Sequence, residues 1–176
     1  MDKFVLRIFQ SEVALQCRFA ISAAHELEAA LVMGSKDDIW KHLQTILVAS
    51  ANLSKMFWGS RGKKEAERAE LRESLQVEDN SPIRDVRLRN DFEHFDERVE
   101  KWAANNAGGW FVGRNIGPFQ SIGGGGLDPL QRFQHFDPDT GMVTFWDTTV
   151  PLGEVFTEIR RILPLAEAES PKPHWE

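Results

Sequence analysis

Apolar residues recur at helical spacing along the first third of the chain, and they predict two long amphipathic helices. The first covers about residues 4–33, is rich in Ala, Leu and Phe, and is expected to break near Ser11. Gly34 should end it, because glycine readily adopts the left-handed backbone that follows a helix. Ser35 then caps the second helix, with Asp38 in the capping-box position three residues further on.

The second helix keeps its apolar residues at alternating spacings of four and three, apart from Ser50 in a gap, and ends at Gly59. A charged helix is predicted at about residues 64–75, and it is too short to be stable alone. The apolar positions of the second helix are Ile39, Leu43, Ile46, Leu53 and Phe57.

The clearest helix signal lies near the middle of the chain. Ser81 is a good N-cap and Pro82 stands at the first helical position, so a helix should begin there. One narrow apolar stripe follows at spacings of four, three, four and three, which predicts a single long helix that ends in the run Asn105–Gly109. The stripe consists of Leu88, Phe92, Phe95, Val99 and Trp102.

Residues 107–150 hold most of the glycines and predict loops and strands. Gly123–Gly126 lacks the lysine and the hydroxyl of a phosphate-binding loop, so we interpret it as a mobile loop. The turn cluster Asp137–Gly141, followed by β-branched and aromatic residues up to Trp146, predicts a β-hairpin. A last helix should begin at Pro151. Its apolar face consists of Leu152, Val155, Ile159 and Ile162.

Together these elements predict a mainly α fold, an antiparallel bundle of four to five helices with a β-hairpin insertion near residues 130–147. We expect a single domain over residues 1–176. It includes the loop and hairpin insertion at 107–150 and a C-terminal helix at 151–169.

Composition and charge narrow the classes of function. The net charge of −6 argues against a general nucleic-acid coat, although residues 55–89 carry a net +2 and residues 90–176 a net −7. The single cysteine, Cys17, excludes an internal disulfide and a cysteine-based zinc site, and we expect a packed thiol. No apolar run predicts a signal peptide or a membrane span, so we expect a cytoplasmic protein without membrane contact.

The segment Arg89–His94 carries the most informative chemistry of the chain. A guanidinium can hold a phosphate with two hydrogen bonds, and an imidazole can transfer a proton near neutral pH. Arg89 and His94 are therefore a minimal set for handling a phosphodiester. RNA supplies its own nucleophile, the ribose 2′-hydroxyl, so we expect no metal and no cofactor. Asn90 could orient the imidazole or bond to the phosphate.

The arrangement of these residues on a helix has a consequence for assembly. At about 100° per residue, all three point away from the apolar stripe, but Arg89 and His94 lie about 140° apart around the axis. A second copy of the helix could close this gap, so the interpretation implies a homodimer. The alternative is an ordinary solvated face of mixed charge, in which Glu93 follows Arg89 and Arg98 follows His94 at a spacing of four.

Three further cations are candidate substrate-binding residues, because Lys55, Arg84 and Arg87 could line a phosphate path near Arg89. They could equally be ordinary surface charges. The remaining histidines show no spacing typical of metal ligands, and His135 should point outward from its strand.

The sequence around this segment resembles that of HEPN-domain proteins. Their motif is an arginine, a following polar residue and a histidine after four to six intervening positions, which Arg89, Asn90 and His94 match. The wider text Leu88–Arg98 is similar to a group of uncharacterised bacterial HEPN-like proteins, and the similarity covers about residues 40–165. The other similar segments are Ser54–Trp58, Leu71–Arg72, Phe136–Gly141 and Thr144–Trp146.

The resemblance implies an all-α bundle, usually dimeric, with the motif in a cleft at the dimer interface. Many members are metal-independent ribonucleases in toxin–antitoxin, abortive-infection or CRISPR-linked defence, which would make Arg89 and His94 a catalytic pair supported by Asn90. We therefore predict a homodimeric HEPN-type endoribonuclease, a toxin or defence component, that leaves a 2′,3′-cyclic phosphate. The alternative is an inactive module of the same fold that dimerises, binds a nucleotide, or binds an antitoxin or nucleotidyltransferase partner.

Overall fold

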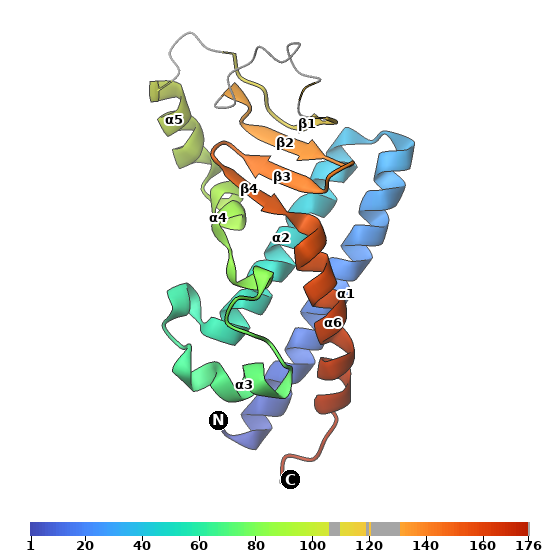
Figure 1. The fold of residues 1–176 in the computed structure, drawn as a ribbon, viewed down its shortest axis with the longest axis vertical. Helices are drawn as coiled ribbons and strands as arrows, with labels where there is room; N and C mark the ends of the chain where they lie inside the picture. Colours follow the sequence, from blue (N-terminus) through green and yellow to red (C-terminus); the bar gives the residue numbers. More distant parts are fainter. Residues whose placement is uncertain (106–109, 119, 121–130, 176) are drawn as a thin grey trace. The chain divides into compact units, whose positions relative to one another are not determined.

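The computed structural model describes residues 1–105, 110–118, 120 and 131–175 (Figure 1). The chain forms two compact units. The first unit comprises Met1–Val86 and Glu154–Glu176, and the second comprises Arg87–Gly153. The glycine run predicted as a mobile loop, Gly123–Gly126, lies outside the described residues.

Two long antiparallel helices form the centre of the first unit. α1 (Lys3–Met33) is continuous, so the prediction of a break near Ser11 is wrong. Ser11 is exposed, and it interrupts neither the helical backbone nor the buried face that contains Gln10 and Val13. Gly34 ends α1 with a φ of 69°, as predicted, and the chain returns along α1 as α2 (Lys36–Trp58).

The two ends of α2 follow the prediction only in part. Ser35 stands at the N-cap, but its hydroxyl donates to the Asp38 carboxylate at 2.6 Å and accepts no backbone N–H, so the predicted capping box is not formed. Gly59 ends the helix, and the whole predicted apolar stripe is buried. The short helix η1 (Ser60–Gly62) follows. The one helix predicted at about residues 64–75 is then two short helices, η2 (Ala66–Arg68) and α3 (Ala69–Ser74).

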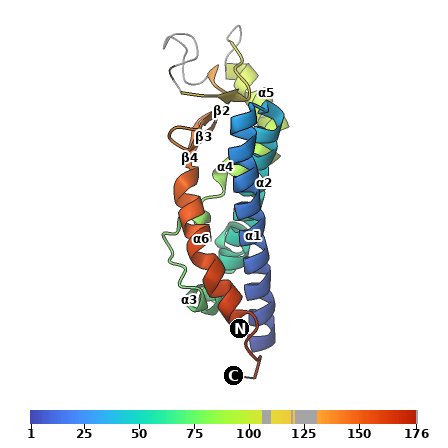
Figure 2. The same ribbon diagram turned by 90° about the vertical axis from the view of Figure 1, so that its right-hand side faces the viewer.

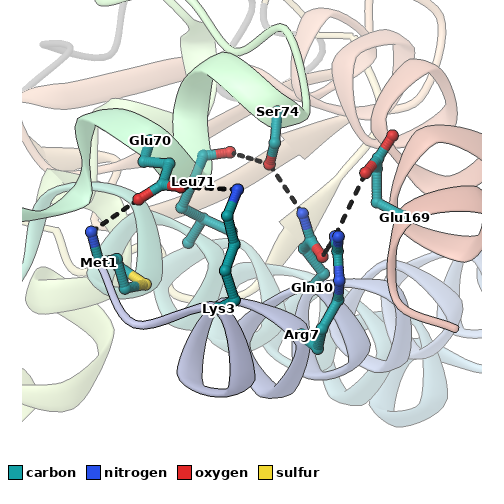
Figure 3. Close-up of polar contacts among 8 residues, drawn as sticks. All are labelled: Met1, Lys3, Arg7, Gln10, Glu70, Leu71, Ser74 and Glu169. Carbon is teal, nitrogen blue, oxygen red and sulfur yellow. Dashed lines mark hydrogen bonds and ion pairs between the residues drawn. The ribbon is translucent and has the colours of Figure 1, made fainter. Parts of the chain in front are cut away.

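The C-terminal helix completes the bundle of the first unit. α6 (Leu152–Glu169) confirms the predicted last helix, and beyond its first turn it runs beside α1 (Figure 2). Figure 3 shows how polar side chains tie α1 to α6 and to α3. Arg7 pairs with Glu169 at 3.3 Å, and Gln10 donates to the Ser74 hydroxyl at 2.9 Å. The predicted helical bundle is thus built from α1, α2 and α6.

The second unit contains a four-stranded sheet in the order β1-β2-β3-β4, in which β1 is parallel to β2 and the other neighbours are antiparallel. The predicted hairpin is confirmed. Its turn is closed by Asp137, whose carboxylate accepts the N–H of Asp139 at 3.1 Å, and by Gly141 at a φ of 67°. The strands are β1 (Asn115–Ile116), β2 (Gln134–Asp137), β3 (Met142–Phe145) and β4 (Thr148–Pro151).

The segment predicted as one long helix is three helices, so that prediction is wrong. Extended backbone at Asp85 follows the first helix, and a turn at His94 separates the second from the third. The spacing of apolar residues missed the second break because the helical phase continues through it. His94 N–H donates to Asn90 C=O at 2.9 Å, as in a regular helix. The three helices are η3 (Pro82–Arg84), α4 (Arg87–Glu93) and α5 (Phe95–Asn105).

The apolar stripe of α4 and α5 packs against aromatic residues of the sheet. The ring centroids of Phe92 and Phe145 are 4.9 Å apart, and those of Phe95 and Phe133 are 5.6 Å apart. Trp102 lies 6.1 Å from Phe133, whose own side chain is completely buried. Aromatic pairs at these distances stabilise a core beyond their buried area. These two helices therefore share a core with the hairpin.

Candidate functional site

The junction of α4 and α5 positions the three motif residues. Arg89 and Asn90 lie in α4, and His94 occupies the turn before α5. The backbone at His94 remains well bonded, since its C=O also accepts the N–H of Arg98 at 3.0 Å. The packing of Phe92 and Phe95 on the sheet fixes both sides of this turn. The motif is therefore carried by a backbone that its own unit holds in place.

Arg89 is more enclosed than its predicted position on the polar side implied. Its side chain is only 13% exposed, and it forms an ion pair with Glu93 at 2.6 Å. One guanidinium nitrogen, Nη1, also donates to Asn90 Oδ1 at 3.1 Å. The guanidinium is thus fixed by two neighbours on its own helix, and a phosphate would have to share it with a carboxylate.

His94 is open to solvent, with a side chain that is 54% exposed. Its Nδ1 lies 3.6 Å from the Glu97 carboxylate. Arg98, four residues after His94, bonds to Asp91 at 2.7 Å. Within the described residues, no hydrogen bond or ion pair joins Arg89 to His94. One copy of the chain therefore does not bring the predicted catalytic pair into contact.

The three predicted substrate-binding cations divide between the two units. Lys55 and Arg84 belong to the first unit, and Arg87 belongs to the second. Arg84 is held by the Glu65 carboxylate at 2.8 Å and donates to the Asp79 C=O at 3.0 Å, so it has a structural role. Lys55 is exposed on α2, and Arg87 is exposed at the start of α4.

A polar pocket of about 280 Å³ opens beside Asn90, between α4, α5 and the turn that joins β3 to β4. We call it the α4–α5 pocket. Its wall combines three cations with two carboxylates, an amide, a hydroxyl and an indole. The cations are Arg87, Arg98 and Lys101, and the other lining residues are Asn90, Asp91, Trp146, Asp147 and Thr148.

Sequence reasoning placed only Arg87 and Asn90 of this pocket in the candidate site. The other charged residues of the helical wall follow Arg87 at successive spacings of four, seven and three, which places them on one side of the helical segment. They are Asp91, Arg98 and Lys101. That spacing was a usable signal. The contribution of Trp146 was not visible, because the residue comes from a turn whose position depends on how the sheet packs.

The Asp91–Arg98 pair forms the fixed part of the pocket. Asp91 is buried, and the hydrogen bond that its carboxylate accepts from Arg98 is the main reason that the pKa of Arg98 is raised above its ordinary value. Lys101 lies with its ammonium 5.4 Å from the centre of the Trp146 ring. A cation at this distance from an indole is attracted to the face of the ring. The pocket thus holds two cations in defined positions.

His135 contradicts the prediction that it points outward. It is only 1% exposed, and its Nδ1 lies 2.9 Å from the side-chain amide of Asn115 on the neighbouring strand β1. The prediction assumed that one face of the strand meets solvent, but all four residues of β2 are buried. Burial lowers the pKa of His135 below its ordinary value.

Cys17 is completely buried in α1, as the prediction of a packed thiol requires, and burial raises its pKa to about 12. In the described ranges, no group of three or more His, Cys, Asp or Glu side chains is arranged to hold a metal ion. None of the described helices combines the length and the apolar character needed to cross a membrane.

No family model, curated protein or solved structure gives a significant match to this chain. The resemblance to HEPN proteins therefore stays a prediction. Two of the segments that carry the resemblance, Ser54–Trp58 and Leu71–Arg72, contact each other in the first unit. The Arg72 guanidinium donates to the C=O of Phe57 at 2.7 Å. That contact gives these segments a structural role and is independent of the motif residues.

Proposed function

We propose that the protein is a metal-independent endoribonuclease of the HEPN type that acts as a homodimer. The observation that supports this best is the contrast between two motif residues five positions apart. Arg89 presents a guanidinium fixed by Asn90 and Glu93, and His94 presents an accessible imidazole. A fixed cation suits a phosphate, and an accessible imidazole can accept a proton from the substrate or donate one to it.

The proposed reaction needs one base and one acid. The imidazole of one His94 removes the proton of the ribose 2′-hydroxyl, whose oxygen attacks the adjacent phosphorus. The bond from phosphorus to the 5′-oxygen breaks, and the imidazolium of the second copy's His94 donates a proton to that oxygen. The products are a 2′,3′-cyclic phosphate and a free 5′-hydroxyl. Arg89 stabilises the negative charge that develops on the phosphate oxygens.

A homodimer is part of this proposal for a geometric reason. Among the described residues no hydrogen bond or ion pair joins Arg89 to His94, and Asn90 bonds to Arg89. Two copies that face each other across a shared cleft supply a second Arg89 and a second His94 to the same phosphate. The proposed partners are thus a second copy of the chain and RNA, with an antitoxin as a further protein partner.

The test is cleavage of a single-stranded RNA by the purified chain in the presence of a metal chelator. His94→Ala is expected to lower the rate about 10²- to 10⁴-fold, the usual contribution of a general acid–base group. Arg89→Ala should lower it as well, whereas the control His25→Ala, at an exposed position of α1, should match the parent. Full activity of His94→Ala would contradict the proposal, as would products without a cyclic phosphate end.

A second candidate function is a partner-binding module without catalysis. The observation that favours it is the Glu93 carboxylate, which lies 2.6 Å from Arg89 where a phosphate oxygen would bind. The net charge of −7 over residues 90–176 also opposes binding of a polyanion. This candidate predicts that the parent chain does not cleave RNA, and that Arg89→Ala and His94→Ala do not change this result.

A further inference from the structure

We propose that the α4–α5 pocket binds one nucleotide of the RNA, with its phosphate held by Lys101. This inference rests on the proposed ribonuclease function and names a second contact for the same substrate. Asn90 connects the two sites, because it bonds to Arg89 of the motif and also lines the pocket. A strand bound at the motif would therefore have its neighbouring nucleotide beside the pocket.

One cation of the pocket, Lys101, is in a position to attract an anion. The buried Asp91 is bonded to Arg98, so these two charges offset each other within the wall. Lys101 has no ion-pair partner among the described residues, and only Asp147 remains as a second carboxylate. A phosphate would gain attraction from the Lys101 ammonium without displacing a carboxylate, which differs from the situation at Arg89.

The size and the remaining groups suit a nucleotide better than a bare phosphate. A volume of about 280 Å³ lies just below the range of about 300–1,000 Å³ typical of small-molecule sites. Trp146 supplies a half-buried aromatic ring, and bases stack on such rings in single-strand binding proteins. The Thr148 hydroxyl and the Asp147 carboxylate can bond to ribose hydroxyls.

The backbone holds the indole at the pocket. Trp146 has a φ of 51° in the turn between β3 and β4, which is uncommon for a residue other than glycine. The backbone N–H of Trp146 donates to the C=O of Phe133 at 2.8 Å, and this bond fixes the turn to the core of the unit. The aromatic wall is therefore in place before a ligand binds.

The experiment measures binding of a short fluorescent single-stranded RNA by anisotropy, with adenosine monophosphate and inorganic phosphate as competitors. Lys101→Gln is expected to weaken RNA binding about tenfold and Lys101→Arg to restore most of it. The control Lys41→Gln removes the same charge from an exposed position of α2 and should bind like the parent. Adenosine monophosphate should compete better than inorganic phosphate. It should also quench the tryptophan fluorescence of the parent more than that of Trp146→Phe.

Each outcome separates this inference from the proposed function. RNA binding that depends on Lys101 and survives in His94→Ala supports the pocket, even if no RNA is cleaved. Cleavage that proceeds in Lys101→Gln with the KM of the parent leaves the ribonuclease standing and overturns the pocket. Equal loss of binding in Lys101→Gln and Lys41→Gln overturns it as well, as does a parent chain that binds neither RNA nor the monophosphate.

Discussion

At the scale of single residues, the two halves of the predicted catalytic pair have opposite environments. Arg89 is enclosed and already bonded to a carboxylate, whereas His94 is half exposed. Both residues have charged neighbours along the sequence. The sequence alone does not show which of these neighbouring side chains contact them across a helix turn. The neighbours of Arg89 therefore decide how readily a phosphate can bind there.

Removal of the charge at Glu93 should make Arg89 more available. We expect Glu93→Gln to lower the KM for RNA by about fivefold at most, because partly exposed ion pairs contribute about 1 kcal/mol or less. Steady-state kinetics at low salt would measure this. Glu100→Gln removes an equal charge from an exposed position of α5 and is the matched control. If both variants have the same effect, Glu93 does not compete for Arg89.

Acid should destabilise the second unit through His135. Burial is the largest cause of its lowered pKa; Arg132 acts in the same direction, and Asp137 opposes both. Between this lowered pKa and the ordinary value of 6.5, the unfolded chain binds more protons than the folded chain. Stability is therefore full above about pH 6.5 and falls as the pH drops through that window.

The check is a set of urea unfolding curves between pH 7.5 and pH 5.5. His135→Gln keeps a group that can accept a hydrogen bond from Asn115 but does not titrate. Its unfolding midpoint should fall less over this range than the midpoint of the parent. Parallel decreases in the two proteins would assign the pH dependence to other groups.

At the scale of elements, the two glycines that end α1 and α2 differ in what surrounds them. Both have positive φ, 69° at Gly34 and 74° at Gly59. A Cβ at Gly34 would meet nothing within 4 Å, whereas at Gly59 it would lie 2.5 Å from the Cβ of Lys64. The first position tests the left-handed backbone alone, and the second adds a steric clash.

We expect Gly34→Ala to lower the free energy of unfolding by about 1–2 kcal/mol, the cost of the left-handed conformation. Gly59→Ala should cost more than Gly34→Ala, because the segment that carries Lys64, just after η1, must also move to relieve the overlap. Urea unfolding of the two variants measures the difference. Equal losses would show that the chain after Gly59 adjusts without cost.

Element prediction succeeded where a helix buries one regular stripe along its own length. The stripe of α2, from Ile39 to Phe57, is such a case. It was wrong at Asp85, because Pro82 favours the start of a helix but does not extend it, and Ser81 forms no side-chain cap bond. The break at His94 was missed because the stripe of α4 and α5 stays in phase across the turn.

At the scale of the whole molecule, the proposed function requires two copies. We expect light scattering to give a mass twice the 20.1 kDa of one chain at micromolar concentration. Ribonuclease activity per chain should fall on dilution below the dimer dissociation constant, since neither copy alone joins Arg89 to His94. Activity per chain that stays constant while the protein becomes monomeric would show that one copy is sufficient.

The sequence by itself determined the helices of the bundle, the hairpin turn at Asp137–Gly141 and the chemical character of Arg89, Asn90 and His94. Periodicity and turn residues are local properties, so they can be recognised along the chain. The tertiary structure decided the rest. It buried His135, packed α4 against Phe145 and α5 against Phe133, and brought Trp146 to Lys101. Each of these depends on contacts between residues far apart in the sequence.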